Sequence, residues 1–343
     1  MANEKKWWIY EGKETTKGIE KLEAIKEEKP PWRKRGNHNA TVFTPFGEEV
    51  IDAVNAAIYL RRPLLVTGEP GIGKSTLAKQ LALMLTPSQK VLRWDITSKS
   101  TLKDALYSYD ALARLHDIQM KKLYYELRHQ ENNQDVLEYA NLKTGIENYL
   151  KLGAIGTAFI NDTPSVVLID EIDKSDIDLP NDLLHIFEEQ HFEIPELKRL
   201  TVNQNGKNKK PYEIEDTQGN LKEILDGLVE CQGDFPIIVM TSNGEREFPP
   251  AFLRRCISVH LTMPDKEEEK IAMLSDMVEA HFARSKEDER IQDLIKAFVN
   301  LDDGQIHTND QLLNAVYLVL KADGVKSEEF KRKFNKTVWY PVG

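Results

Sequence analysis

One short stretch, residues 68–75, constrains the fold of this chain more than any other. Its sequence, Gly-Glu-Pro-Gly-Ile-Gly-Lys-Ser, is a complete G-x-x-x-x-G-K-[ST] pattern, which is typical of a phosphate-binding loop. Before it, residues 63–67 form an apolar run suited to a buried strand. After it, residues 75–85 carry apolar side chains at helical spacing, and Pro87 follows. The sequence therefore predicts a strand, a loop and a helix in this order.

The chemistry of the loop follows from its residue types. Glycines let the backbone pass close to phosphate oxygens, and the loop N–H groups together with the helix N-terminus favour an anion. Lys74 is expected to reach the β- and γ-phosphates, and the Ser75 hydroxyl is expected to bind Mg²⁺. We expect a nucleoside triphosphate to be held by Gly68, Glu69, Pro70, Gly71, Ile72, Gly73, Lys74, Ser75 and Thr76.

Composition excludes several classes of protein. The 343 residues are 41% hydrophobic and 30% charged, enough for one large domain or two ordinary ones with a sizeable core. A net charge of -10 argues against a chain built to coat nucleic acid. Cys231 and Cys256 are the only cysteines, which argues against a disulfide framework. The N-terminus lacks the apolar core of a signal peptide and no apolar run approaches membrane-spanning length, so we expect a cytoplasmic protein.

Three regions are predicted along the chain. Residues 1–45 are a lysine- and glutamate-rich extension, whose aromatic groups at 7–10 and 30–33 pack either on the chain's own body or on an adjacent subunit. Residues 46–264 alternate apolar strands with helices, whereas 265–343 carries only helical patterns. This order predicts an α/β fold, with a parallel sheet flanked by helices and a C-terminal all-helical region.

The strand predicted at 165–171 ends in two acids. The run is apolar until it reaches Asp170 and Glu171, and downstream of a phosphate loop this is the Walker B pattern. Asp170 is expected to hold the Mg²⁺ shell. Glu171 is expected to polarise the attacking water as a general base. An acid pair at a strand end is weak evidence alone, but together with the loop it predicts hydrolysis of the nucleotide.

Two segments interrupt the alternation of strands and helices. Residues 101–155 are strongly charged and predict a helical insertion. Around 191–216, two alternating stretches flank a basic segment with the turn signal Asn205-Gly206, which predicts a β-hairpin with a basic tip. This hairpin is either a solvated surface element or a loop that engages a substrate.

Four features occur in an informative order. They are the run 62–68 that enters the phosphate loop, the run 167–173 around the two acids, Asn243 at the end of a buried strand, and the run Pro-Pro-Ala-Phe-Leu-Arg-Arg at 249–255. This order resembles the AAA+ ATPases, and most closely their MoxR-like branch. The resemblance covers about 46–335.

The resemblance implies an ATPase that binds ATP and Mg²⁺ between the subunits of a homo-oligomeric ring, usually a hexamer. It implies that Asn243 is the sensor that orients the hydrolytic water. Arg254 or Arg255 would be the arginine finger, which reaches the γ-phosphate bound by a neighbour. The two insertions would line the central pore, and 265–343 would be a helical lid. The start of the third lid helix, 307–311, lacks the arginine that the family often carries, which puts lid-coupled sensing in doubt and allows slow hydrolysis.

MoxR-like proteins commonly partner with von Willebrand A-domain proteins and remodel other proteins, and some related sets belong to bacterial conflict and defence systems. The resemblance therefore implies an ATPase that remodels or activates a protein client. Two alternatives stay open. The first is a nucleic-acid-linked motor or a nucleotide-gated defence switch; the basic stretch 198–210 favours it and the acidic net charge opposes it. The second is a regulatory module that binds ATP with little turnover, which Glu171, Asn243 and the paired arginines oppose.

Overall fold

The computed structural model describes residues 46–127, 143–202, 211–233, 235–282, 288–301 and 308–321. The predicted extension 1–45 lies outside these residues, and so does most of the basic segment, 203–210. The described residues belong to two compact units. One unit comprises Glu48–Thr67 and Leu81–Val259, and the other contains Gly68–Gln80 and the helices that follow His260.

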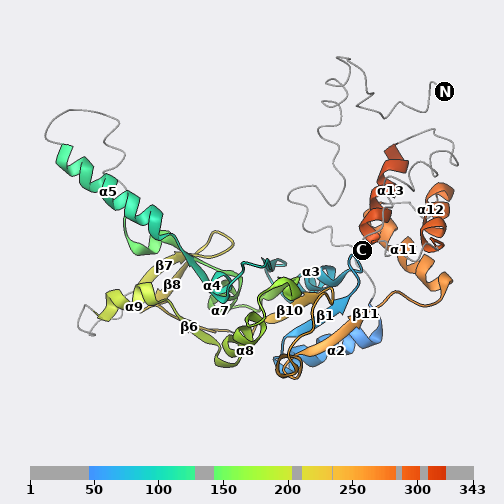
Figure 1. The fold of residues 1–343 in the computed structure, drawn as a ribbon, viewed down its shortest axis with the longest axis horizontal. Coiled ribbons are helices and arrows are strands. Elements are labelled where there is room, and N and C mark those ends of the chain that lie inside the picture. Colours follow the sequence, from blue (N-terminus) through green and yellow to red (C-terminus); the bar gives the residue numbers. More distant parts are fainter. Residues whose placement is uncertain are drawn as a thin grey trace, which may run out of the picture. The chain divides into compact units, whose positions relative to one another are not determined.

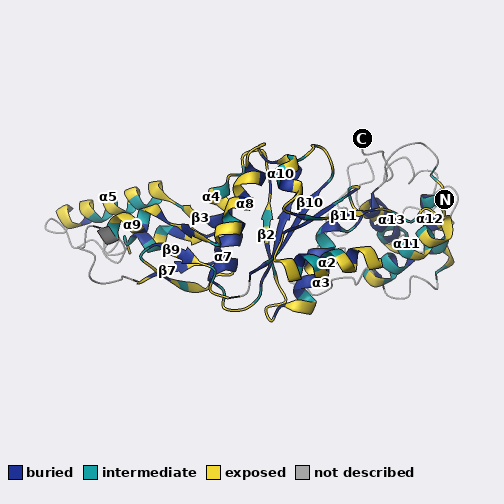
Figure 2. Ribbon diagram, turned by 90° about the horizontal axis from the view of Figure 1, so that it is seen from below, coloured by how far each residue is buried: buried dark blue, intermediate teal, exposed yellow. Residues whose placement is uncertain are grey.

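The first unit is built on a five-stranded sheet with the order β11-β1-β10-β5-β2. Figure 1 labels its strands β11, β1 and β10. In this sheet β1 pairs in parallel with β10, β10 with β5, and β5 with β2. The central strands β5 and β10 consist almost entirely of buried residues, which Figure 2 shows in dark blue. This is expected of a parallel sheet that is covered on both faces. The strands are β1 (Leu64–Gly68), β2 (Val91–Asp95), β5 (Val166–Asp170), β10 (Ile237–Ser242) and β11 (Ile257–Leu261).

Helices flank this sheet, which confirms the predicted fold class. All seven residues of α7 are buried, because this helix contacts β2 and β5 of the first sheet and also strands of a second one. Gly156 lets α7 approach closely, since a Cβ atom there would lie 2.1 Å from the Leu106 carbonyl oxygen. The helices of this unit around the sheet are α2 (Glu48–Leu60), α7 (Ala154–Ile160), α8 (Leu179–Glu189) and α10 (Pro250–Leu253), and α3 (Lys74–Leu85) follows the phosphate loop along the chain.

A second sheet of six short strands belongs to the same unit and has the order β3-β4-β7-β8-β9-β6. One continuous core joins both sheets, with Phe159 of α7 and Phe192 of β6 among its largest members. The strands are β3 (Tyr107–Tyr109), β4 (Leu150–Leu152), β6 (His191–Glu193), β7 (Pro211–Glu215), β8 (Leu221–Leu225) and β9 (Leu228–Glu230).

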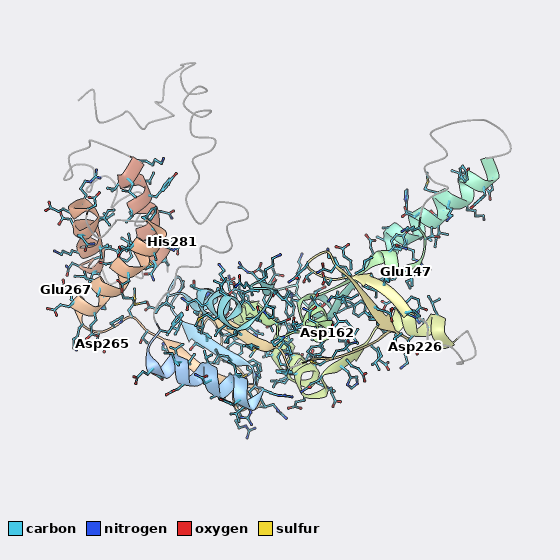
Figure 3. All side chains as sticks on the ribbon, turned by 180° about the vertical axis from the view of Figure 1, so that it is seen from behind. Glu147, Asp162, Asp226, Asp265, Glu267 and His281 are labelled. Carbon is cyan, nitrogen blue, oxygen red and sulfur yellow. The ribbon has the colours of Figure 1, made fainter. Side chains whose placement is uncertain are left out.

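The predicted hairpin over 191–216 is wrong. Strand β6 pairs with β9, and β7 pairs with β8. Between β6 and β7 the chain forms α9 (Pro195–Val202), because Pro195 suits the first helical turn and apolar side chains follow at helical spacing. Two turns in this region join paired strands. Residues 216–220 connect β7 to β8, and Asp226-Gly227 connects β8 to β9, where both residues have positive φ (57° and 77°) and Leu225 pairs with Leu228. Figure 3 labels Asp226 in this turn.

The predicted helical insertion at 101–155 is only partly helical. It contains α4 (Leu102–Leu106) and α5 (Ala111–Leu127), but also the strands β3 and β4, which pair with each other in antiparallel register. Between α5 and β4 lies the short helix η2 (Ile146–Tyr149). The interpretation as wholly helical fails because three-residue strands leave almost no alternation to detect.

Three helices of the second unit form the predicted all-helical lid. They are α11 (Glu267–His281), α12 (Glu289–Val299) and α13 (Asn309–Lys321). Leu274 and Val278 of α11, Ile295 of α12 and Leu312 of α13 are buried in their common core. In α12 the apolar residues Ile291, Leu294, Ile295 and Phe298 recur at helical spacing and are all buried, which explains why the pattern predicts this helix.

Candidate functional site

The phosphate-loop pattern lies between the end of β1 and the start of α3, as the sequence predicts. Three of its glycines have positive φ: 146° at Gly68, 81° at Gly71 and 103° at Gly73. These values favour glycine and allow the backbone to curl before the helix begins. A Cβ atom on Gly73 would meet no atom within 4 Å, so the loop is open there, whereas one on Gly68 would lie 2.5 Å from the Leu261 carbonyl oxygen.

Lys74, the first residue of α3, is only 7% exposed. Its Nζ donates hydrogen bonds to the carbonyl oxygens of Gly68, at 2.6 Å, and Glu69, at 2.8 Å. The ammonium group is therefore held within the loop and faces the backbone of the residues that precede the helix. A cation enclosed by the loop at a helix N-terminus fits the binding of a phosphate group.

Asp170, the last residue of β5, is buried and bonded through both carboxylate oxygens. Oδ1 accepts a hydrogen bond from the Thr241 hydroxyl at 2.6 Å, and Oδ2 accepts one from Nη2 of Arg93 at 2.8 Å. Arg93 lies on the neighbouring strand β2, is half exposed, and also contacts Asp95. A guanidinium thus neutralises the carboxylate that the sequence assigns to the Mg²⁺ shell.

Glu171 follows β5 directly and has a left-handed backbone, with φ 61° and ψ 50°. Its N–H donates to the Thr241 hydroxyl at 2.9 Å. Its side chain is 43% exposed and accepts a hydrogen bond from Lys174 of the helix η3 (Ile172–Lys174) at 2.8 Å. That hydrogen bond raises the pKa of Lys174, against a smaller opposite effect of desolvation. The candidate general base therefore points to solvent and is paired with a cation.

Asn243 follows β10, and its backbone is tied to the turn after β5. Its N–H donates to Oδ2 of the buried Asp173 at 2.9 Å, and the N–H of Glu245 donates to the same oxygen at 3.2 Å. Nη1 of Arg246 donates to the Ser175 carbonyl at 2.7 Å. These bonds join the segments that follow the two strands, so Asn243 and Glu171 are carried by connected parts of the chain.

The two adjacent arginines have different surroundings. Nε of Arg255 forms an ion pair with Oε1 of Glu188, on α8, at 2.6 Å, and both side chains are more than half exposed. Arg254 is exposed and has no ion pair with any of the residues that the structure describes. The in-chain partner of Arg255 is therefore Glu188.

The first residues of α13 lie against the phosphate loop. A Cβ atom on Gly71 would lie 3.1 Å from the Asn309 nitrogen and 3.2 Å from Oδ1 of Asp310. Thr308, Asn309 and Gln311 are buried although they are polar. The start of α13 thus places the Asn309 backbone nitrogen, the Thr308 Cβ and the Asp310 carboxylate next to Gly71, where the resemblance would lead one to expect an arginine.

Comparison with known protein families decides the identity of the fold. The family model described as AAA domain (dynein-related subfamily) matches residues 63–256, which is more than half of the chain. The chain belongs to this AAA domain family. The match contains β1, the phosphate loop, both acids, Asn243 and the paired arginines.

Comparison with solved structures finds weaker likenesses to this AAA domain. The NtrX structure from Brucella abortus is 14% identical with a TM-score of 0.44; the alignment covers 90% of this chain but only 57% of the NtrX chain. A candidate ATPase from Cytophaga hutchinsonii is 16% identical with a TM-score of 0.33, over 80% of this chain and 72% of that one. A comparison with curated proteins finds no match.

The order of the AAA domain's strands determines at which edge of the first sheet the predicted residues follow the strands. Thr67 of β1 pairs with Ser242 of β10, and β10 runs parallel to β5, so all three strands end at one edge of the sheet. Asp170, Glu171 and Asn243 are brought to this edge by β5 and β10. The phosphate loop leaves the same edge, because it follows β1 directly. Ligands of open α/β sheets bind outside this edge.

Four further residues at this edge are not predicted from the sequence: Arg93, Asp173, Lys174 and Thr241. Each is a polar side chain beside or inside an apolar run, which is a weak signal by itself. Thr241 interrupts the buried strand β10, and Arg93 stands between Leu92 and Trp94 in β2. Their contacts with Asp170 become evident only when the order of the strands in the sheet is known.

The end of β5 offers a donor of the type that Mg²⁺ uses. Within the described ranges, no group of three or more His, Cys, Asp or Glu side chains could hold a metal ion. Mg²⁺ usually takes one or two carboxylates together with phosphate oxygens and water. The Asp170 carboxylate at the end of β5 is a donor of this kind. The helices that the structure describes include none long and apolar enough to cross a membrane.

Asp310 is expected to weaken phosphate binding, because its carboxylate lies next to Gly71. Asp310→Asn should lower the Kd of ATP by roughly two- to fivefold at low salt, and the gain should shrink as salt is added. Isothermal titration calorimetry at two salt concentrations measures this. Asp293→Asn, on α12, removes the same charge elsewhere in the lid and serves as the control. Equal affinities for wild type and Asp310→Asn would contradict the expectation.

Proposed function

We propose that this AAA domain is an ATP hydrolase of the MoxR-like branch, which acts at the subunit interfaces of a ring, usually a hexamer, and remodels or activates a protein partner. The observation that carries the proposal is the common edge at which β1, β5 and β10 end, followed respectively by the phosphate loop, the two acids and Asn243. The site needs all three of these elements for triphosphate hydrolysis. The MoxR-like assignment rests on the sequence runs around these elements.

Each residue has a proposed role. Residues 68–76 hold the phosphates of ATP, and Lys74 leaves the loop carbonyls to contact them. Mg²⁺ supplies charge neutralisation on the phosphates when it is bound, with Ser75 and Asp170 as its protein ligands. Glu171 accepts a proton from the attacking water once its side chain turns from Lys174. Asn243 orients that water.

Arg254 is the better candidate for the arginine finger. Arg255 is engaged by Glu188 of its own chain, whereas Arg254 is exposed and free of ion pairs among the described residues. An unpaired guanidinium on the surface can reach a phosphate on a neighbouring subunit without losing an interaction of its own. A homo-oligomeric ring with ATP between subunits follows from this role, and the partner would be a protein client or a von Willebrand A-domain protein in the cytoplasm.

The first test separates binding from turnover. Lys74→Ala should abolish the stabilisation of about 2.7 kcal/mol that ATP at one hundred times its Kd gives to the wild type. Glu171→Gln should keep this stabilisation and lose hydrolysis, because the amide cannot accept the proton. Thermal melting with ATP and phosphate release measure the two effects. Lys79→Ala, an exposed lysine on the same helix, is the matched control.

Either of two results would overturn these roles. Undiminished ATP-induced stabilisation in Lys74→Ala would remove the loop lysine from the binding site. Hydrolysis by Glu171→Gln at the wild-type rate would exclude Glu171 as the base.

The second test compares the two arginines. Arg254→Ala should bind ATP but lose about 10³-fold or more of the hydrolysis rate, the lower range for an arginine finger. Arg255→Ala should lose the half-exposed pair with Glu188, which contributes at most about 1 kcal/mol to stability. Mixtures of Lys74→Ala and Arg254→Ala chains should recover partial activity, measured as phosphate release. In a mixed ring, the Lys74→Ala chain supplies the arginine finger and the Arg254→Ala chain supplies the intact ATP-binding site. No recovery in rings that demonstrably contain both chains would exclude the finger role.

A further inference from the structure

Thr241 makes one hydrogen bond to each of the two acids. Its Oγ1 accepts from the Glu171 N–H at 2.9 Å and donates to Oδ1 of Asp170 at 2.6 Å. A backbone N–H can only donate, so the single hydroxyl hydrogen of Thr241 is left for the carboxylate. The side chain is 1% exposed. Water is therefore a poor substitute for either bond, and the direction of each bond is fixed.

The sheet register holds Thr241 in this place. Val66 of β1 pairs with Thr241 on one side, and Met240 pairs with Ile169 of β5 on the other, so the next residues along are Thr241 and Asp170. Thr241 thus lies between the strand that leads to the phosphate loop and the strand that ends in the acids. It also lies two residues before Asn243.

The bond to Glu171 supports an unfavourable backbone conformation. Glu171 has φ 61°, which residues other than glycine rarely adopt. Such a conformation persists only where surrounding interactions determine it. The Thr241 hydroxyl is the acceptor for the Glu171 N–H, so it fixes the direction in which the side chain of this residue leaves the strand.

The bond to Asp170 distinguishes its two oxygens. Thr241 donates to Oδ1, while Oδ2 faces Nη2 of Arg93 at 2.8 Å. Because Oδ1 accepts the Thr241 hydrogen bond, the Asp170 carboxylate cannot rotate to form a bidentate pair with the Arg93 guanidinium. Oδ2 is then the oxygen that is presented to a cation, and Arg93, which is half exposed, can leave it.

We propose that Thr241 is a positioning residue for ATP hydrolysis, which uses one hydroxyl to set Asp170 and Glu171 relative to each other. This rests on the proposed function, because it assigns the metal ligand and the base to those two acids. Thr241 acts through Asp170 and Glu171. The hydroxyl is the chemical group that matters, so a residue that keeps it should keep the activity.

The experiment compares Thr241→Val, which keeps the shape and removes the hydroxyl, with Thr241→Ser, which keeps the hydroxyl. Thr241→Val should lower kcat about 10- to 100-fold, the range expected for hydrogen bonds to charged groups, with little change in KM. Thr241→Ser should recover most of kcat. Thr157→Val is the matched control, because Thr157 is fully buried and its hydroxyl also accepts from a backbone N–H, that of Thr217, in the second sheet region.

A second readout does not depend on turnover. The Mg²⁺ concentration that gives half of the thermal stabilisation by a non-hydrolysable ATP analogue should rise in Thr241→Val and stay near the wild-type value in Thr241→Ser and Thr157→Val. Freed from Thr241, Asp170 turns both oxygens to Arg93 and competes less well for the metal. If Thr241→Val does not unfold cooperatively, Thr241→Ala takes its place in both measurements.

The outcomes separate this inference from the proposed function. Wild-type kcat and Mg²⁺ dependence in Thr241→Val, or a loss in Thr241→Ser as large as in Thr241→Val, would overturn the role of Thr241 while hydrolysis by the wild type stands. A loss of the same size in Thr157→Val would reduce the effect to lost stability and would also overturn it. Absence of Lys74-dependent hydrolysis in the wild type would overturn the proposed function and this inference together.

Discussion

The parallel pairing of β5 with β10 is the constraint on which the candidate site depends. It places Thr241 beside Asp170 and brings the segments after both strands close enough for Asp173 to accept the N–H of Asn243. Central strands buried on both faces cannot slip in register without exposing apolar side chains and unpairing backbone groups. The positions of these residues at the sheet edge thus depend on the buried centre of the sheet.

The sequence predicts well what is local and periodic. The phosphate loop fixes a strand, a turn and a helix within about twenty residues, because its glycines have positive φ and Lys74 begins α3. The strand that ends in Asp170 and the helix α12 follow from unbroken apolar patterns. The roles of Lys74, Glu171, Asn243 and Arg254 stay predictions, since they concern a nucleotide and a neighbouring subunit.

What the sequence does not predict depends on pairing across long separations. The prediction of a hairpin at 191–216 is wrong because β6 pairs with β9, which follows the turn at Gly227. The sequence of a three-residue strand such as β6 does not indicate which strand it pairs with. The roles of Thr241 and Arg93 cannot be predicted for the same reason. Each is a polar residue in a strand, and only the order of the strands shows that it lies beside Asp170. The difference between Arg254 and Arg255 likewise needs the position of Glu188 on another helix.

We propose that hydrolysis belongs to the assembled ring and not to one chain. The most direct measurement is ATP turnover per chain across protein concentrations that span the assembly observed by light scattering. The account predicts that turnover per chain rises steeply as rings form and then levels off, whereas Arg254→Ala stays low throughout because a finger contributes about 10³–10⁵ in rate. Turnover per chain that is constant from isolated chains to full assembly would contradict it.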